Sequence, residues 1–406
     1  MPALFAGVIF LLCGFGFTVP KNVTVGGVEV GGMNISEAAA KVRENIENEL
    51  KGKTLEVRGQ NKTFTFTYPE INYKDDTFSL LKHAKKGDNL TPTVSYYLCG
   101  LEEIAQGIYL SESVSAVEPS AKFNISGEPF TYSEGHDGKE VIKAKLIDDI
   151  RASLSGGFEP VTVAYKGVKR QKTLQDVKKS TQLLASFTTY FDGSNVCRAS
   201  NIRLAANFLN GKTLEGGKTL SFNDIVGART KNRGFLPAKI IENGEFTEGV
   251  GGGVCQVSTT LYNCALLSGL EISEFHPHSL AVGYVPPSRD AMVSGKAYDL
   301  KIKNPTDCPA YIRAKTGNGS VTFEIYGTKS GAIYSLSSEV TGTLTAPEEI
   351  TEDPEKARVG KDGLTSEGYL TITRGGYKKT VLLRKDKYLP VKSLVYKEEE
   401  TEEALP

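Results

Sequence analysis

Three consecutive glycines, Gly251–Gly253, stand directly in front of a segment with helical periodicity, and they constrain the local fold more than any other feature of the chain. A run of glycine disfavours helix, so the triplet predicts a loop whose backbone can approach a ligand closely. In residues 254–265 the apolar side chains recur at the spacing of one helix face, and Gly269 provides a helix stop. Cys255 is therefore predicted to lie in the first turn of a helix that follows a glycine loop.

The first turn of a helix favours an ionised thiol. Backbone amides there have no helical carbonyl partner and the positive end of the helix dipole is close, so a thiolate is stabilised and an oxyanion can be received during acyl transfer. His278 opens a predicted strand downstream, and Asp290 and Asp299 follow it. This chain order matches a transglutaminase-like thiol site, with Cys255 as nucleophile, His278 as base and one of the two aspartates as the orienting carboxylate.

Polar side chains near the cysteine extend this hypothesis. Gln256 adjoins the thiol and could donate a hydrogen bond to an oxyanion, and Ser258 could line the same cleft. We expect Thr259 and Thr260 to be exposed or to bond back to carbonyl oxygens of the helix instead.

Other interpretations of these residues stay open. Cys255 could be a buried small hydrophobe, and His278 could satisfy a local hydrogen bond. A zinc site formed by Cys255, His276 and His278 is a further alternative, although Pro277 separates the two histidines and no third histidine is near. We therefore expect no metal and no cofactor.

The N-terminus carries the clearest indication of location. Residues 3–19 contain no charged side chain, and Lys21 ends the run. This length is near the short limit for a membrane-spanning helix and slightly long for a signal-peptide core, while a buried core helix fits poorly with the polar sequence that follows. We expect residues 1–20 to be a membrane anchor or signal segment, with the remaining domains extracellular or secreted to the cell wall.

Composition narrows the class of partner. The chain has 406 residues, with 48 basic and 48 acidic side chains. Balanced charge argues against a nucleic-acid partner, which needs a basic face. Six scattered cysteines without a CxxC pair are too few for a disulfide-built scaffold, and the length predicts two to four domains.

The predicted fold class is α+β, in a multidomain chain. Residues 25–170 mix short antiparallel strands with helices, one of which is capped by Asn34. Residues 180–328 predict helices followed by an antiparallel meander. Residues 340–397 predict a small all-β module, and the acidic residues 398–406 predict a disordered tail.

Residues 183–328 resemble a VanW domain, a module associated with accessory proteins of some glycopeptide-resistance clusters. The strings that carry the resemblance are SFTTYF (186–191), NIRLAANFLNG (201–211), LSFNDIVGARTKNRGF (220–235), GGGVCQVSTTLYNCAL (251–266), HSLAVGYVPPSRDAMV (278–293) and YDLKIKN (298–304). Residues 25–170 are similar to the peptidoglycan-binding region that often precedes such domains. Residues 340–397 are similar to a degenerate G-five wall module, with Gly360, Gly363 and Gly368 as candidate glycines.

The resemblance also implies a set of ligand-binding residues. The motif positions expected to contact a ligand are Asn223, Arg229, Gly252, Gly253, Gln256, Ser258 and Tyr262. The chain departs from the family pattern in three places: Phe275 stands where an arginine is usual, residues 215–217 (EGG) where Pro-Gly-Glu is usual, and Ser288 where a glycine is usual. If that arginine binds an anionic group, this chain is expected to bind such a group less well.

Three functional hypotheses follow. The first is a cell-envelope protein that binds or remodels peptidoglycan, with an accessory role in glycopeptide resistance or wall homeostasis. The second is a papain-like or transglutaminase-like cysteine enzyme, a hydrolase or acyltransferase, acting on peptidoglycan stem peptides. The third is an extracellular protein that assembles with other surface proteins. The expected partners are peptidoglycan or its stem peptides and, through the N-terminus, the membrane.

Overall fold

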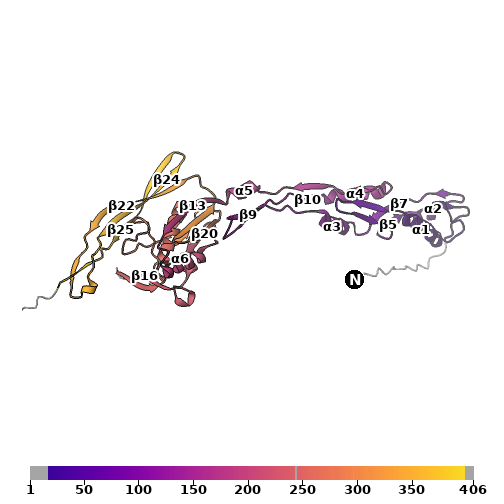
Figure 1. Ribbon diagram of the computed structural model, residues 1–406. Coiled ribbons are helices and arrows are strands. Elements are labelled where there is room, and N and C mark those ends of the chain that lie inside the picture. The colour runs from indigo at the N-terminus through magenta and orange to yellow at the C-terminus, as the bar shows by residue number, and fades with distance from the viewer. Residues whose placement is uncertain (1–16, 243–244, 296, 398–406) are drawn as a thin grey trace, which may run out of the picture. The chain divides into compact units, whose positions relative to one another are not determined.

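The computed structural model describes residues 17–242, 245–295 and 297–397 (Figure 1). The anchor or signal segment expected at residues 1–20 lies almost wholly outside this part of the chain, and the tail expected at residues 398–406 lies entirely outside it. Among the described residues, no helix combines the length and the apolar character needed to cross a bilayer.

The fold is mixed α+β with antiparallel pairing in most of its sheets, which confirms the predicted fold class. The chain divides into two compact units. The first comprises residues up to Glu118 together with Gly135–Gln171, and the second comprises Pro119–Glu134 and the chain from Lys172 onward. Residues 25–170 therefore contribute to both units.

The first unit is built around two apolar clusters. Its elements are β1 (Thr24–Val25), β2 (Val28–Glu29), α1 (Ile35–Lys51), β3 (Leu55–Arg58), β4 (Thr63–Phe66), β5 (Ile71–Asp75), α2 (Thr77–His83), β6 (Asn89–Leu90), β7 (Val94–Leu98), α3 (Leu101–Glu112), β10 (Gly138–Val141), α4 (Lys143–Ser155), β11 (Val161–Thr162) and β12 (Tyr165–Val168). The Asn34 side chain caps α1 by accepting a hydrogen bond from the Ser36 amide at 2.9 Å. Helix α1 then buries Ala38 and Val42 in one cluster, while α3 and α4 pack against short strands in the other.

The second unit holds the largest apolar cluster, and α8 lies at its centre. Its elements are β8 (Ser120–Phe123), β9 (Phe130–Ser133), α5 (Leu174–Lys179), β13 (Gln182–Tyr190), α6 (Val196–Leu209), β14 (Lys212–Leu214), β15 (Thr219–Ser221), α7 (Phe222–Val226), the short helix η1 (Lys231–Arg233), β16 (Pro237–Glu242), β17 (Glu245–Val250), α8 (Val254–Leu267), β18 (Glu271–Glu274), β19 (Lys301–Lys303), β20 (Ala310–Gly317), β21 (Ser320–Gly327), β22 (Ile333–Leu344), β23 (Glu348–Thr351), the short helix η2 (Pro354–Lys356), β24 (Gly363–Arg374), β25 (Tyr377–Tyr388) and β26 (Ser393–Tyr396). Helix α8 packs against the antiparallel sheet β13-β21-β20-β14, and α6 lies beside it.

Helix α8 is buried on almost every side, although its sequence predicts one apolar face. Its polar residues Thr259, Thr260 and Asn263 lie inside the core. Each of them is hydrogen-bonded, for example Thr260 Oγ1 to the Gln256 carbonyl oxygen at 2.6 Å and Asn263 Nδ2 to the Arg289 carbonyl oxygen at 2.7 Å. Buried polar groups with partners cost little stability, so this helix can fill the centre of the unit.

The strand predicted to open at His278 does not form. Residues 275–290 run as an irregular segment. Pro277 and the pair Pro286–Pro287 lack backbone donors for a sheet, and Ser288 adopts a left-handed φ of 59°. The segment is therefore held by side-chain and loop contacts rather than by a strand ladder.

The C-terminal strands form an all-β part of the second unit. Strands β22, β24 and β25 form one antiparallel sheet (Figure 1). Strand β23 pairs with β26 in parallel. Gly375 and Gly376 form the turn between β24 and β25, with φ values of 55° and 86°. Gly368 has no space for a side chain, because an added Cβ would lie 2.6 Å from the Ser288 carbonyl oxygen. Strand β24 thus runs directly against the segment 275–290.

Candidate functional site

The glycine triplet shapes the start of α8. Gly251 and Gly253 have φ values of 93° and 110°, which residues with side chains rarely adopt. An added Cβ on Gly252 would lie 2.6 Å from the Lys239 carbonyl oxygen, so this position also requires glycine. Because Gly253 is the N-cap, Cys255 is the second residue of α8 and lies where backbone amides and the helix dipole favour a thiolate.

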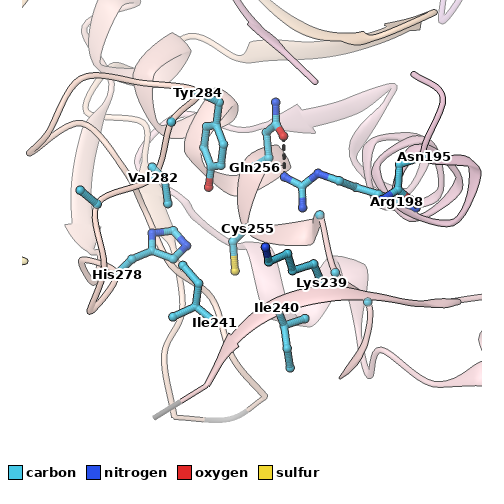
Figure 2. A pocket seen from close by; sticks show the side chains of 15 residues that line it. Asn195, Arg198, Lys239, Ile240, Ile241, Cys255, Gln256, His278, Val282 and Tyr284 are labelled. Carbon is cyan, nitrogen blue, oxygen red and sulfur yellow. Dashed lines mark hydrogen bonds between the residues drawn. The ribbon is translucent and has the colours of Figure 1, made fainter. Parts of the chain in front are cut away.

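The structure brings three of the four predicted catalytic residues together. Asp290 Oδ2 lies 2.6 Å from His278 Nδ1 and accepts a second hydrogen bond from the His278 backbone amide at 2.7 Å. This leaves the imidazole Nε2 on the side of the Cys255 thiol, whose own hydrogen bond is to the Val293 carbonyl oxygen at 3.4 Å. Figure 2 shows the imidazole directed toward the sulfur. The arrangement is that of a nucleophile, a base and an orienting carboxylate.

The three side chains form a charged series. Burial by itself raises the pKa of the Cys255 thiol, but the neighbouring His278 and its charge bring that pKa below its ordinary value. Burial likewise disfavours protonation of His278, yet the hydrogen bond to Asp290 and the neighbouring Cys255 sulfur raise the pKa of its imidazole to about 9. Burial raises the pKa of Asp290, whereas the hydrogen bond to His278 and its charge lower it to about 2. The directions of these three shifts favour a thiolate, an imidazolium and a carboxylate over the neutral forms of the same groups.

The thiol opens into a cavity of about 340 Å³. The residues that line it are Asn195, Arg198, Lys239, Ile240, Ile241, Gly251, Gly252, Gly253, Cys255, Gln256, His278, Ala281, Val282, Gly283 and Tyr284. Two of these side chains, Arg198 and Lys239, are cations, and none of the described residues lining the cavity is an aspartate or glutamate. Figure 2 shows Lys239 extending toward the sulfur. The cavity suits a ligand with an apolar part and a negative charge.

Gln256, one of the expected ligand-binding residues, is engaged inside the protein. Its Oε1 accepts a hydrogen bond from Arg198 Nη2 at 2.8 Å. Its Nε2 donates to Thr189 Oγ1 at 3.0 Å and to the Tyr190 carbonyl oxygen at 2.9 Å. Both amide hydrogens are used, so this side chain holds Arg198 in place and has no donor left for an oxyanion.

Ser258 also faces the core rather than the cavity. Its hydroxyl donates to the Ala291 carbonyl oxygen at 2.6 Å. Thr259 Oγ1 accepts from the Ala291 amide at 2.9 Å. Ser258 and Thr259 thus hold the backbone of Ala291, and they help to fix the position of the preceding Asp290 carboxylate.

Asp299 belongs to a different arrangement. Its carboxylate accepts hydrogen bonds from the Ser221 hydroxyl at 2.5 Å and from the Asn223 amide at 2.9 Å, at the start of α7. Asn223 Oδ1 in turn accepts from Arg229 Nη2 at 2.5 Å. These residues line a second cavity of about 610 Å³. The geometry therefore gives the orienting role to Asp290 and leaves Asp299 to hold α7.

Tyr262 and His276 do not line the thiol cavity. Tyr262 is buried and packs on Phe275, with ring centroids 5.8 Å apart. His276 Nε2 lies 3.2 Å from Glu274 Oε1. The three residues of the zinc alternative are thus not gathered at one point, and the described part of the chain contains no group of three or more His, Cys, Asp or Glu placed to hold a metal ion.

Several residues around the thiol were not singled out by sequence reasoning. They are Arg198, Lys239 and Tyr284, which line the cavity, and Arg384 and Tyr388, which bind Asp290. Tyr284 carried a weak signal, because the alternation along HSLAVGY puts it on the same face of the predicted strand as His278. The others have no local pattern, since their positions depend on contacts between distant parts of the chain.

Comparisons with known proteins concern the same region. The family model described as "VanW like protein" matches residues 197–326. The uncharacterized protein YoaR of Bacillus subtilis is 45% identical over 147 residues, which are 36% of this chain and 48% of that protein. The vancomycin B-type resistance protein VanW of Enterococcus faecalis is 30% identical over 142 residues, which are 34% of this chain and 52% of that protein. The chain thus spans about half the length of these curated relatives, and no solved structure matches it.

Proposed function

We propose that this VanW-like protein is a thiol enzyme that transfers or hydrolyses acyl groups at Cys255. The observation that carries the proposal is the hydrogen-bonded pair of His278 and Asp290, with the imidazole directed toward the Cys255 sulfur at the wall of a cavity. Cys264 on the same helix provides the contrast, because it is fully buried and burial raises the pKa of its thiol to about 12. The surroundings of Cys264 are those of a cysteine that serves only to fill the core. The surroundings of Cys255 are those expected of a nucleophile.

In the proposed reaction, the Cys255 thiolate attacks the carbonyl carbon of an amide or ester and forms a C–S bond. The backbone amide of Cys255 receives the developing oxyanion, since the neighbouring Val254 and Gln256 amides already donate to the Gly251 and Gly253 carbonyl oxygens. His278 donates its Nε2 proton to the leaving nitrogen or oxygen as the carbon–heteroatom bond breaks, and a thioester remains. Water or an acceptor amine then attacks the thioester, His278 takes up a proton from the attacking group, and the thiolate is released.

The charge of the cavity favours an acyl donor that carries a carboxylate. Arg198 and Lys239 line the cavity on the side of α6 and β16. Gln256 holds the Arg198 guanidinium at 2.8 Å, so this cation is oriented before a ligand arrives. Ile240 and Ile241 add an apolar wall suited to a short aliphatic side chain.

Peptidoglycan stem peptides meet this description, since they combine short aliphatic side chains with free carboxylates. One relative is named as a vancomycin B-type resistance protein, and residues 25–170 and 340–397 resemble wall modules. We therefore propose that the reaction takes place at the cell envelope, with the chain anchored or exported through residues 1–20. An accessory role in glycopeptide resistance or wall homeostasis is part of this proposal.

The first test needs no substrate. The full chain is treated with iodoacetamide at pH 6 to 7, and alkylation is followed at each cysteine by mass spectrometry. We expect Cys255 to react faster than the exposed Cys99 and Cys197, because its surroundings lower the pKa of its thiol. Reaction of Cys255 no faster than of the exposed thiols would refute the proposed nucleophile.

The second test addresses the reaction. Purified muropeptides are incubated with the parent chain, with Cys255→Ala and with Cys99→Ala as the matched control, and the products are analysed by mass spectrometry. We expect cleaved or amine-exchanged peptides with the parent and the control, and none with Cys255→Ala. Equal muropeptide binding by the parent and Cys255→Ala without turnover by either would replace the proposal with a wall-binding function. A crosslinked surface protein, in the absence of any muropeptide binding, would point to an assembly function instead.

A further inference from the structure

The carboxylate of Asp290 has a second set of partners, and these come from strand β25. Asp290 Oδ1 accepts a hydrogen bond from the Tyr388 hydroxyl at 2.6 Å and lies 3.4 Å from Arg384 Nη2. Arg384 Nη1 also donates to the backbone carbonyl oxygen of Asp290 at 2.5 Å. The two oxygens of the carboxylate therefore have separate tasks, because Oδ2 binds His278 and Oδ1 binds the hairpin of β24 and β25.

This contact is enclosed and its members are themselves held. Asp290 is 0% exposed, Tyr388 1% and Arg384 6%. Asp386 Oδ2 accepts from Arg384 Nε at 2.6 Å, so the guanidinium lies between two carboxylates. Burial by itself lowers the pKa of Arg384, but Asp386 and Asp290 raise it above its ordinary value and keep the side chain charged. A buried charge with two such partners has little freedom to turn away.

The hairpin also fixes the backbone that leads to Asp290. The Ser288 amide donates to the Tyr388 hydroxyl oxygen at 2.7 Å, and the Ser288 and Ser366 hydroxyls lie 2.7 Å apart. Ser288 has a left-handed φ of 59°, which is costly for a residue with a side chain. Gly368 permits the close approach, since an added Cβ would lie 2.6 Å from the Ser288 carbonyl oxygen. The strained turn before Asp290 is thus stabilised by contacts from β24 and β25.

We infer that the hairpin of β24 and β25 is part of the thiol site, with Tyr388 and Arg384 as positioning residues that orient His278 through Asp290. The inference rests on the proposed function. When the hairpin holds Oδ1, the plane of the Asp290 carboxylate is fixed. Oδ2 then accepts the hydrogen bond from His278 Nδ1 in one orientation only. The ring then directs Nε2 at the sulfur instead of rotating. The C-terminal strands, which the sequence assigns to a separate wall module, therefore complete the site around α8.

The test compares two tyrosine variants on the same hairpin in the full chain. Tyr388→Phe removes the hydroxyl that binds Asp290, and the matched control Tyr369→Phe removes a hydroxyl that donates to Glu367. The readout is the pH dependence of Cys255 alkylation by iodoacetamide. In Tyr388→Phe we expect the rate at pH 6 to fall roughly threefold to tenfold and the midpoint to move to higher pH, because the Asp290 carboxylate is no longer held in one plane and the imidazolium faces the sulfur less of the time. The profile of Tyr369→Phe should match that of the parent.

The outcomes separate the inference from the function on which it rests. An ordinary, slow reaction of Cys255 at pH 6 in the parent would overturn the proposed function. A fast reaction in the parent that is unchanged in Tyr388→Phe would overturn only the role of the hairpin. If Tyr388→Phe does not fold, Ser366→Ala takes its place, because it removes a single contact to Ser288. A smaller shift in the same direction is then expected, and an unchanged profile would overturn the inference.

Discussion

Replacement of Asp290 by asparagine keeps the shape of the side chain and removes its charge. In the native chain one carboxylate oxygen accepts hydrogen bonds from His278, and the other accepts from Tyr388 and faces Arg384. All of these partners are donors. In Asp290→Asn the amide NH₂ group must therefore face a donor whichever way it is turned. The variant leaves one buried donor without an acceptor and deprives Arg384 of one of its two counter-charges.

The structure sets the size of the expected effect. The native surroundings lower the pKa of Asp290 from 3.8 to about 2. Each pKa unit corresponds to about 1.4 kcal/mol, so the interactions of the carboxylate contribute roughly 2 kcal/mol to the free energy of unfolding. An unsatisfied buried donor adds a cost of roughly 1 to 3 kcal/mol. We expect Asp290→Asn to lower the free energy of unfolding by about 3 to 5 kcal/mol at pH 7.

Cys264 supplies a local assay for this loss. Cys264 lies on α8 at 0% exposure, so a thiol reagent reaches it only when the second unit opens. Burial also raises the pKa of its thiol to about 12, so the folded state reacts slowly. The rate of Cys264 labelling in native buffer, divided by the rate in denaturant, gives the equilibrium constant for opening. The free energy of opening follows from that constant. Asp290→Asn should be labelled roughly a hundredfold to several thousandfold faster than the parent. The exposed Asp307→Asn is the matched control and should behave like the parent.

Two results would refute this reasoning. One is a Cys264 labelling rate in Asp290→Asn within about threefold of the parent at pH 7, where tenfold corresponds to about 1.4 kcal/mol. The other concerns acid. Because the pKa of Asp290 is depressed in the folded state, its contribution is present above the unfolded value of 3.8 and is lost as the pH falls toward 2. The difference between parent and variant should therefore shrink over that range, and a constant difference would contradict the assignment.

Three further predictions concern the same unit. The pH profile of acyl transfer should rise as Cys255 ionises and fall as the pH rises through about 9, where His278 loses the proton that its raised pKa retains; an undiminished rate at pH 10 would contradict the imidazolium as proton donor. Gly253→Ala should destabilise the second unit by roughly 1 to 3 kcal/mol, because its φ is 110° and an added Cβ would lie 2.9 Å from a neighbouring side chain. Calorimetry should show a lower melting temperature for this variant, and an unchanged melting temperature would count against the prediction. Lys239→Glu should raise the KM for a carboxylate-bearing acyl donor roughly tenfold with kcat within about twofold, whereas Lys212→Glu on the exposed part of β14 should change neither value.

The sequence predicts the start of α8 well because its determinants are local. Glycine conformation and helix periodicity act over a few residues, and they are sufficient to put Cys255 in the first turn. The order of the chain also names both aspartates as candidates for the carboxylate. It does not decide between Asp290 and Asp299, since that depends on the path of the irregular segment 275–290.

The remaining features of the site depend on long-range contacts. The strand predicted at His278 is absent: prolines stand on both sides of it, and the His278 amide bonds to the Asp290 side chain instead of to a neighbouring strand. Arg384 and Tyr388 reach Asp290 across 94 and 98 residues of sequence, and such a distance leaves no periodic signature. Gln256 adjoins the thiol in sequence, and only the tertiary structure shows that its side chain is already fully bonded.

Because α8 is enclosed by a sheet, a helix and loops, the sulfur of Cys255 cannot be moved without breaking the core of the second unit. The cavity surfaces that face the sulfur are less constrained, because Lys239 and most of the apolar lining residues lie on the hairpin of β16 and β17 and in the irregular segment 275–290. Substitutions there can change which molecules enter at small cost in stability. Proteins with this core can therefore diversify in what they recognise while the chemistry at the helix tip stays the same.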